Sequence, residues 1–448
     1  MTTAPWPEPV RLPVRWLVTE GLGRLVVGRA ARQGDPQARL IVDPATRADP
    51  HPVYEQIRAA GPLVRTRISL ITAHHAVAAE VLRSDDFGVV PSGVELPGVL
   101  GRLTTATRTD AVSPVLPPSL LAVDPPDHTR YRALVSSVFT ARAVARLRDR
   151  VAEIAAELLD RLEARAGRGE VVDLVEAYAS TLPVAVISEI LGVPAADRDR
   201  VLRLGEAAAP SLDFVVPWRL FVQTERALRE FDRYLAAHLD RLRRDPGDDL
   251  LSQLVHAADD EGRLDDRELR STAGLVLAAG FETTVNLLGT GAWLLMRHPD
   301  QLALLREDPA RWPTAVDEVL RFEPPVQLTA RVARRATTVA GRPVGVGDMV
   351  VTLLAAAGRD PAVFADPDRF DVTRANAGRH LAFSAGRHFC LGAALARAEG
   401  EVGLRMLFER FPDLALAGEG TWRPTRVLKG FAHLPVRLGD RSGATTAA

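Results

Sequence analysis

The sequence predicts a mainly α fold of the α+β class, with many helices and a few small, grouped β-sheets. Apolar residues recur at helical spacing along most of the 448 residues, and short β-type runs gather in a few places. No low-complexity linker and no repeat divides the chain. These three observations favour a helix-rich single domain.

Composition limits the possible functions. The chain has 47% hydrophobic and 25% charged residues and a formal net charge of −1, which is typical of a globular protein with a substantial core and gives no indication of nucleic-acid binding. Its longest apolar windows fall short of the roughly 20 residues of a membrane-spanning helix. The N-terminus lacks the pattern of a secretory signal, so we expect a cytoplasmic protein without an integral membrane segment.

The N-terminal half is predicted to contain short helices followed by longer ones. Val14 to Gln33 predicts an amphipathic helix that could touch a membrane surface; a helix docked on the body and a partly disordered leader are the alternatives. The pattern then predicts helices at His51–Ala60 and Ala76–Arg83 around a hairpin at Leu63–Thr72, a long Gly-, Pro-, Ser- and Thr-rich loop at Gly88–Val123, and helices within Asp127–Arg165, Val172–Leu191 and Asp197–Arg244.

The C-terminal half is predicted to be built around one long helix. Asp266 to Arg297 has helical spacing up to Pro299 and would be roughly 48 Å long at 1.5 Å per residue. Because its middle is apolar nearly all round, this helix should run through the core. The residues that follow predict a helix at Trp312–Phe322, β-type runs between Thr329 and Leu354, an irregular meander at Asp360–Arg374 and a closing hairpin at Val427–Leu438.

A polar cluster interrupts the apolar middle of the long helix. Ala279-Gly280-Phe281-Glu282-Thr283-Thr284 places a glycine, an acid and two hydroxyls where each is costly. The threonines can bond back to the preceding turn, and Gly280 lets a ligand approach the backbone. The cluster could therefore open a space that holds water and passes protons. The alternative is an ordinary helix with a packing glycine and satisfied polar side chains.

Cys390 is the only cysteine of the chain, so it cannot form an internal disulfide. It lies in His380-Leu-Ala-Phe-Ser-Ala-Gly-Arg-His-Phe-Cys-Leu-Gly392, where Gly386 and Gly392 permit a tight turn close to a flat partner. Leu391 onward has helical spacing, which predicts Cys390 at a helix amino terminus, where the helix dipole favours the thiolate. Because thiolate is the metal-binding form of cysteine, this setting suggests an iron ligand.

Two further pairs carry little information alone. Glu318 and Arg321 are three residues apart on a predicted helix, where opposite charges can meet. His128 and Arg132 lie one turn apart and could bind an anion; a solvated basic face is the alternative.

Together and in this order, the motifs resemble those of the cytochrome P450 family, specifically its bacterial members. Phe383-Ser-x-Gly-x-His-x-Cys-x-Gly392 is similar to the family's haem-binding signature, Glu318 and Arg321 to its Glu-x-x-Arg pair, and Ala279-Gly280-x-Glu282-Thr283 to its oxygen-activation motif. Phe364–Phe370 resembles the meander whose arginine, here Arg369, would complete a structural clamp with that pair. Ser384 and Gly358 depart from the family pattern, which usually has glycine and asparagine there.

The resemblance covers Asp49 to Leu438 and implies a haem domain over residues 49–448 behind a leader of residues 1–48. It implies haem b between the long helix and the cysteine loop, with Cys390 as the iron ligand. The other residues that it assigns to haem binding are His128, Arg132, Ala279, Gly280, Arg331, Phe383, Gly386, His388 and Gly392. Glu282 and Thr283 would be the catalytic residues that pass protons to dioxygen through water.

The resemblance also implies a haem-thiolate monooxygenase that hydroxylates or epoxidises a lipophilic small molecule. We expect a natural-product intermediate; a catabolic substrate is the alternative. The pocket walls would come from Gly88–Val123, Ala207–Phe221, Leu275, Ala279, Val326–Thr329 and Phe431–Leu434.

Because no nucleotide-binding glycine motif or flavin domain is present, electrons should come from outside the chain. The family resemblance implies that a ferredoxin and its NAD(P)H-dependent reductase supply them. Arg387, Arg397 and Arg142 could form the basic docking patch for the ferredoxin. We expect a monomer.

Two other functions fit part of the pattern. A haem protein could bind or sense a ligand without turnover, although Glu282 and Thr283 would then have no evident use. A cysteine hydrolase that uses Cys390 and His388 is disfavoured, because these residues are only two apart and no orienting or oxyanion motif is found.

Overall fold

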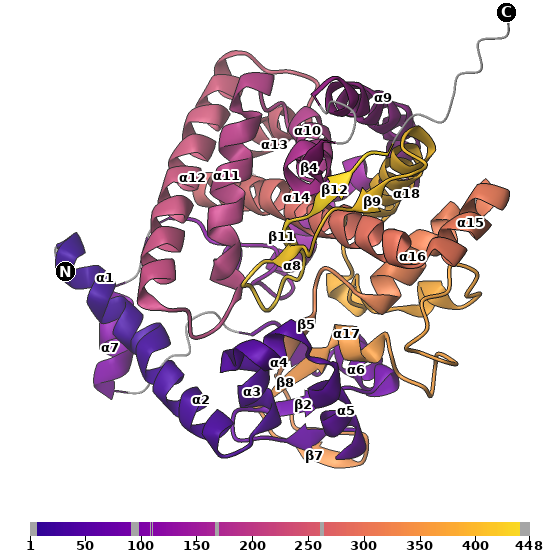
Figure 1. The fold of residues 1–448 in the computed structure, drawn as a ribbon. Helices are drawn as coiled ribbons and strands as arrows, with labels where there is room; N and C mark the ends of the chain where they lie inside the picture. Colours follow the sequence, from indigo (N-terminus) through magenta and orange to yellow (C-terminus); the bar gives the residue numbers. More distant parts are fainter. Residues whose placement is uncertain are drawn as a thin grey trace, which may run out of the picture.

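Helix α14 (Asp266–Arg297) runs through the middle of the molecule with the bounds that the sequence predicts (Figure 1). The computed structural model describes residues 7–90, 98–107, 109, 111–165, 170–259 and 264–439. Asp265 caps α14, since its carboxylate accepts the N–H groups of Arg267 and Glu268 while the Glu268 carboxylate accepts the Asp265 N–H. Twenty of the 32 residues of α14 are buried, which confirms that it is a core helix.

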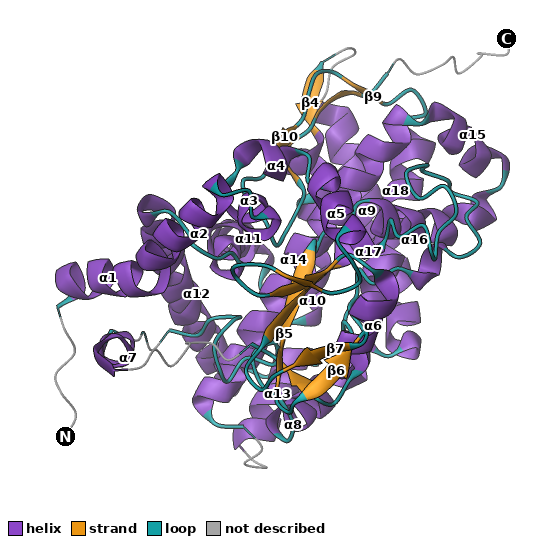
Figure 2. Cartoon of the chain, turned by 90° about the horizontal axis from the view of Figure 1, so that it is seen from below, coloured by secondary structure: helices purple, strands orange, loops and turns teal. Residues whose placement is uncertain are grey.

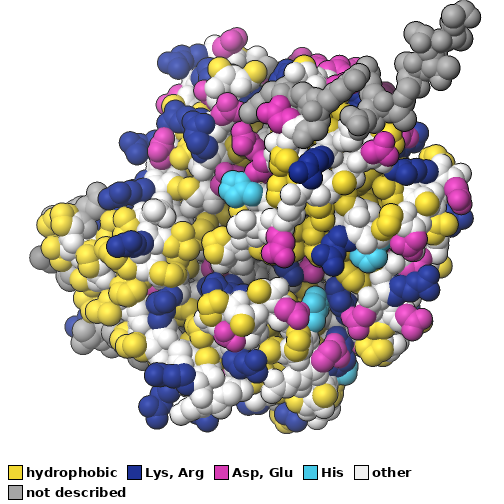
Figure 3. Space-filling view, in the orientation of Figure 1, with side chains coloured by type: hydrophobic (Ala, Val, Ile, Leu, Met, Phe, Trp, Pro, Cys, Tyr) yellow, Lys and Arg dark blue, Asp and Glu magenta, His cyan; other side chains and the backbone are white. Residues whose placement is uncertain are grey.

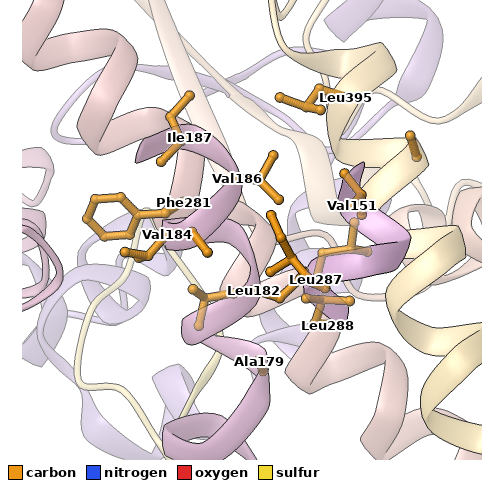
Figure 4. Close-up of a cluster of buried hydrophobic side chains, with 14 of the residues drawn as sticks. Val151, Ala179, Leu182, Val184, Val186, Ile187, Phe281, Leu287, Leu288 and Leu395 are labelled. Carbon is orange, nitrogen blue, oxygen red and sulfur yellow. The ribbon is translucent and has the colours of Figure 1, made fainter. Parts of the chain in front are cut away.

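The largest hydrophobic core surrounds α14. Figure 4 shows Leu182, Val184 and Ile187 of α10 (Thr181–Ile190) beside Phe281, Leu287 and Leu288 of α14, with Val151 of α9 (Ala141–Arg165) and Leu395 of α18 (Ala393–Arg410) nearby. Each such side chain contributes roughly 1.5–3 kcal/mol when fully buried. This packing holds α14 against α18, the helix that follows Cys390.

The remaining helices cover this core. The longest of them, α12 (Trp218–Arg244), has 27 residues, and α16 (Trp312–Phe322) has 11. The others are α1 (Glu8–Trp16), α2 (Leu22–Arg32), α3 (Pro36–Val42), α4 (Pro44–Ala48), α5 (His51–Ala59), α6 (His75–Arg83), α7 (Gly98–Ala106), α8 (Asp127–Val135), α11 (Arg198–Ala208), α13 (Leu250–Asp259), α15 (Pro299–Glu307) and α17 (Leu354–Ala357). A π-helical turn, η1 (Leu17–Gly21), joins α1 to α2, and a second, η3 (Val175–Ala179), precedes α10.

The strands form small groups among the helices, as Figure 2 shows. The main sheet has the order β1-β2-β8-β5-β3, in which only β2 and β8 are parallel. Its strands are β1 (Val64–Arg65), β2 (Leu70–Thr72), β3 (Phe87–Gly88), β5 (Leu328–Ala333) and β8 (Met349–Leu353). The smaller sheets pair β6 (Thr337–Val339) with β7 (Arg342–Val344), β10 (Thr421–Trp422) with β11 (Phe431–His433), and β12 (Pro435–Arg437) with both β4 (Val171–Asp173) and β9 (Ala415–Leu416).

Three sequence-based expectations about elements are wrong. The long segment at Gly88–Val123 contains helix α7, which packs against α1 and η1. The segment Val172–Leu191 begins as strand β4 and not as a helix. No hairpin closes the chain at Val427–Leu438, because Leu434 alone separates β11 from β12 and the shortest common hairpin loop has two residues.

The leader helices lie against the body of the molecule. The helix predicted at Val14–Gln33 is present as the end of α1, η1 and α2. Trp16 donates its indole N–H to the Val216 carbonyl, which ties the leader to the α11–α12 connection. Among the described residues, no helix has both the length and the apolar content needed to cross a bilayer.

Candidate functional site

A cavity of about 400 Å³ separates α14 from the segment 382–392. Its lining is mostly apolar and comes from the α11–α12 connection, α14, β5 and the residues around Cys390. Eleven of the twelve predicted site residues line this one cavity: His128, Arg132, Ala279, Gly280, Glu282, Thr283, Arg331, Phe383, His388, Cys390 and Gly392. Residues from four separate segments of the chain, 128–132, 279–283, 331 and 383–392, therefore meet in one space.

Gly386, the twelfth residue, does not line the cavity but shapes the loop that does. Its φ is +69°, and a side chain there would place Cβ 2.4 Å from the Leu82 carbonyl oxygen. Ser384 has a similar φ of +62°, so a serine occupies a left-handed conformation that favours glycine. The Cys390 N–H then donates to the Phe383 carbonyl at 2.9 Å, which closes the loop around the sulfur.

Cys390 is not at the helix terminus itself. Helix α18 begins at Ala393 with Gly392 as its N-cap, so Cys390 lies two residues before the cap. Burial raises the pKa of the Cys390 thiol, although the Gly392 N–H, Arg132 and Arg397 act to lower this pKa. The predicted preference for thiolate is therefore wrong for the protein alone, because desolvation outweighs the helix end. A metal cation at the sulfur would reverse the balance.

Cationic and potentially cationic side chains crowd one edge of the cavity. The rings of His128 and His388 lie 4.2 Å apart between centroids, and the Nε2 atom of each is buried without a hydrogen-bond partner among the described residues. Burial lowers the pKa of His388 to about 3, with Arg331 and His128 adding to the effect. Burial also lowers the pKa of Arg331 to about 10. The acid near these groups is Asp124, with its Oδ1 3.7 Å from Nε2 of His388, which is beyond hydrogen-bond distance.

This edge fits the carboxylates of a haem. Like charges and nitrogens without a hydrogen-bond partner are costly in a buried place unless an anion accepts their hydrogen bonds. Two propionates would supply acceptors for His128, His388, Arg132 and Arg331, and the thiol of Cys390 lines the same cavity. The residues present thus match the donor set that haem requires.

The opposite wall carries the acid and the hydroxyl of α14. Thr283 donates its hydroxyl to the Ala279 carbonyl at 3.0 Å, as predicted for a threonine that bonds back to the preceding turn. Glu282 is 5% exposed, and its Oε2 has no hydrogen-bond partner in the described part of the chain. Burial raises the pKa of Glu282, and Arg423 opposes this rise.

Gly280 serves helix packing. A side chain at this position would place Cβ 2.7 Å from Cγ1 of Ile187 on α10. The glycine therefore lets α10 and α14 approach closely, which supports the alternative that the sequence left open for this residue, although Gly280 also lines the cavity.

Two residues that sequence reasoning missed form a charged cluster with Glu282, in which Arg423 lies between the two acids. Nη1 of Arg423 lies 3.5 Å from Oε1 of Glu282, and Nη2 of Arg423 donates to Oε1 of Glu206 at 2.8 Å. Glu206 lies on α11 and is partly exposed, so the three side chains connect the cavity wall to the surface. No local pattern could have found this cluster, because its members are far apart in the sequence.

Glu399 of α18 is a second buried acid that sequence reasoning missed. It is 1% exposed, lines the cavity, and its Oε2 has no hydrogen-bond partner among the described residues. Burial raises the pKa of Glu399 well above its ordinary value. The available signal was its position next to Ala398 on the predicted apolar face of that helix.

The clamp consists of Glu318, Arg321 and Arg374, and the expectation that Arg369 completes it is wrong. Glu318 and Arg321 are fully buried and pair at 2.7 Å, and Nε of Arg374 lies 3.2 Å from the same carboxylate. Arg369 contributes its backbone carbonyl, which accepts from both arginines. Arg321 also donates to the Gly358 carbonyl at 2.8 Å. The meander wraps around the pair in a way that brings Arg374 inward.

The predicted pocket walls are largely present, with one exception. Cavity residues come from Val89, Val112–Pro114, Leu120–Leu121, Ala208–Ala209, Ser211–Leu212, Leu275, Ala279, Val326 and Leu328–Thr329. Phe431–Leu434 does not line the cavity, because Phe431 stacks on Trp422 at 3.8 Å and Leu434 is fully buried. Val427 and Leu428 take that place.

Two of the three arginines suggested for a docking patch are already paired. Arg387 pairs with Asp85, and Arg397 pairs with Asp317 at 2.7 Å and lies over the Phe383 ring. Arg142 is exposed. Arg397 therefore supports the loop around Cys390 more directly than it offers a free charge.

Comparisons with known proteins agree in pointing to one family. The family model described as Cytochrome P450 matches residues 108–311 and 313–430. A Mycobacterium tuberculosis protein named cytochrome P450 140 is 57% identical over 429 residues, which cover 95% of this chain and 97% of that protein. The 6-deoxyerythronolide B hydroxylase of Saccharopolyspora erythraea is 47% identical over 321 residues, 70% of this chain and 76% of that protein.

A solved structure shows the same fold. The cytochrome P450 PksS of the bacillaene polyketide synthase from Bacillus subtilis 168 superposes with a TM-score of 0.75 at 33% identity. The superposition covers 88% of this chain and 98% of PksS.

Proposed function

The chain belongs to the cytochrome P450 family of monooxygenases, and we propose that it hydroxylates or epoxidises a lipophilic natural-product intermediate. The observation that carries this proposal is the cavity itself. One wall presents the thiol of Cys390, the facing helix presents Glu282 and Thr283, and one edge carries unpartnered histidine nitrogens. A haem domain over residues 49–448 would contain all of these groups.

In this proposal Cys390 holds the iron of haem b. His128, Arg132, Arg331 and His388 bind the propionates, and Phe383 shields the sulfur from water. Gly386 and Gly392 shape the loop that surrounds the sulfur, and Ala279 and Gly280 of α14 line the cavity that would hold the haem. Bound haem supplies the activation of dioxygen and the transfer of one oxygen atom to substrate.

Glu282 and Thr283 are proposed to move protons. Burial raises the pKa of Glu282, which favours its protonated form, and its unpartnered Oε2 is available to a water molecule. Thr283 can accept a hydrogen bond while its own proton is directed at the Ala279 carbonyl. Arg423 acts to lower the pKa of Glu282 against the effect of burial, so the carboxyl group can release its proton and bind another.

The substrate is proposed from the walls and from the relatives. The walls are mainly Val, Leu, Ala and Phe, which favour a lipophilic molecule and provide few fixed polar contacts. The name of the 6-deoxyerythronolide B hydroxylase from Saccharopolyspora erythraea, and the bacillaene polyketide synthase with which PksS is named, favour a natural-product intermediate. We further propose that a ferredoxin and its NAD(P)H-dependent reductase supply electrons and that the protein acts as a monomer in the cytoplasm.

The spectrum of the reduced protein with carbon monoxide tests the site. The wild type should show the long-wavelength Soret band of thiolate ligation, and Cys390→Ala should lose this band. A purified wild-type protein that takes up no haem would contradict both the monooxygenase and a haem sensor.

Coupling of electron use to product formation separates turnover from mere binding. Thr283→Ala should keep the spectrum but release most reducing equivalents as peroxide, whereas Thr283→Ser keeps the hydroxyl and should remain coupled. Full coupling in Thr283→Ala would contradict the proton-delivery role. Candidate substrates can be found beforehand by the spin-state shift that follows displacement of iron-bound water.

A further inference from the structure

The exposed apolar side chains of this protein are concentrated on one surface. Eleven large hydrophobic side chains are exposed in the described residues, and only Leu121, Val171, Val346 and Phe389 lie elsewhere. Figure 3 shows hydrophobic side chains gathered at the left of the molecule, over the N-terminal helices. We call this the N-terminal apolar surface; its members are Val10, Leu17, Leu22, Leu25, Val26, Phe214 and Trp218.

The N-terminal apolar surface is separate from the face by which the leader docks. Leu12, Val27 and Ala30 are buried and pack, with Trp16, against Val215, Val216 and Phe221 of the body. Leu25 and Val26 point away from that contact and are 71% and 65% exposed. Burial against the body therefore does not explain them, and an apolar surface of this kind usually marks an interaction site.

Within residues 9–32 and 213–226, the exposed charged side chains at this surface are all positive. The acids of residues 9–32 and 213–226 are Glu20, Asp213 and Glu225, and all three contact the body. Glu20 accepts the Val216 N–H, Asp213 accepts the N–H groups of Arg426 and Val427, and Glu225 pairs with Arg15 at 2.8 Å.

Arginines, in contrast, lie exposed at the same surface. They are Arg29 and Arg32 at the end of α2 and Arg219 and Arg226 at the start of α12. An apolar centre with a cationic rim complements an anionic lipid layer, in which apolar side chains enter the interface and arginines contact headgroups. A second copy of this chain would instead bring like charges together.

We propose that the N-terminal apolar surface binds the face of an anionic membrane, with α1 and α2 lying in the plane of the headgroups. The contact is peripheral. It also has a consequence for the cavity, which rests on the proposed function: Ala208, Ser211 and Leu212 line the cavity just before Phe214 reaches the surface. A lipophilic substrate dissolved in the membrane would then be next to a wall of the cavity.

Sedimentation with vesicles tests the proposal on the full-length protein. Wild type should bind phosphatidylglycerol vesicles at least about tenfold more tightly than phosphatidylcholine vesicles, and salt should weaken the binding. The double variant Leu25→Asp/Val26→Asp should bind phosphatidylglycerol at least about tenfold more weakly. Val346→Asp is the matched control, because Val346 is 70% exposed but lies between β7 and β8, and it should bind like wild type.

Three results would overturn the proposal. They are failure of the wild type to sediment with phosphatidylglycerol vesicles, unchanged binding by the double variant, and a wild-type dimer in light scattering that the double variant disperses. The last would assign the surface to a second copy. Vesicle binding does not require haem, so it can fail while the carbon monoxide spectrum supports the proposed function, and the reverse also holds.

Discussion

The clamp and the cavity differ in whether their buried charged groups have hydrogen-bond partners within the chain. Glu318 and Arg321 are fully buried, and each makes several hydrogen bonds at ordinary distances. In the cavity, His128 and Glu282 are also buried and His388 is partly buried, yet each has a buried polar atom without a hydrogen-bond partner among the described residues. The clamp is complete within the chain, whereas the cavity requires something from outside it. Buried charge therefore has a structural role in the clamp and a functional role in the cavity.

Removal of one member of the clamp should have the largest effect on stability. Arg321→Ala leaves the Glu318 carboxylate buried with one arginine fewer, which should cost about 3–5 kcal/mol of unfolding free energy. Since single domains are stable by only about 5–15 kcal/mol, chemical denaturation should show a severely weakened protein. A loss below about 1 kcal/mol would mean that the clamp is not the structural region of this comparison.

In the cavity, loss of a polar group should affect turnover and leave stability nearly unchanged. Glu282→Gln keeps the size of the side chain but cannot give up a proton, so product formation should fall about 100-fold. The carbon monoxide spectrum and the unfolding midpoint should stay near those of wild type. Glu282→Asp is the matched control and should recover part of the rate. A Gln variant with wild-type turnover would remove the acid from the proposed proton path.

The raised pKa of Glu399 should make the unfolding free energy depend on pH. Because its pKa is raised in the folded state above its ordinary value of 4.5, its stabilising contribution is complete below that value and is lost as pH rises towards the folded pKa. The loss should be about 1.4 kcal/mol per pH unit in that window. Glu399→Gln should remove this slope, so the stability of the variant relative to wild type should increase as the pH rises above 4.5. Parallel curves from urea denaturation would contradict a buried, neutral Glu399.

Arg423 contacts both the partly exposed Glu206 and the buried Glu282, and its removal should have a moderate effect on product formation. In Arg423→Gln the pKa of Glu282 should rise further, because the arginine opposes the effect of burial. Product formation should then fall by about tenfold, the equivalent of roughly 1.4 kcal/mol, and its pH profile should move to higher pH. Arg423→Lys keeps the charge and should move the profile less. An unchanged profile in the Gln variant would show that Arg423 only supports the fold.

Removal of an exposed ion pair should have the smallest effect on the unfolding free energy. Arg65 and Asp348 pair at 3.0 Å, but the Arg65 side chain is 52% exposed. Arg65→Ala should therefore change the unfolding free energy by no more than about 0.5 kcal/mol. If its cost approached that of Arg321→Ala, burial would not be the property that separates the clamp from ordinary ion pairs.

Helical spacing predicted much of the fold, since it reports directly on burial. The bounds of α14 and α16 follow from apolar periodicity and from the prolines nearby. Strand pairing could not be predicted in the same way, because β4 lies far in the sequence from its partner β12 and from β9, and their contact depends on the finished fold. Helix α7 was missed because Gly and Thr give a weak helical signal and contacts with the leader decide its structure.

The sequence predicted which residues form the site better than it predicted their pKa values and charged partners. Motif residues indicated which side chains gather in the cavity, and eleven of the twelve line it. The pKa of Cys390 was misjudged because the helix end is a local feature, whereas desolvation depends on everything packed around the sulfur. Arg374 in the clamp and the Glu206–Arg423–Glu282 cluster were missed for the same reason, as their partners are remote in sequence.

The contact between Arg321 and Gly358 restricts how segments can be exchanged with relatives. A Cβ atom at residue 358 would lie 2.2 Å from the Arg321 carbonyl oxygen, so the asparagine usual in the family has no room here unless that backbone moves. A chimaera that imports only the segment around residue 358 should therefore misfold locally, and a graft would have to carry α16 and the meander together. These two segments must be exchanged together, although more than thirty residues separate them in the sequence.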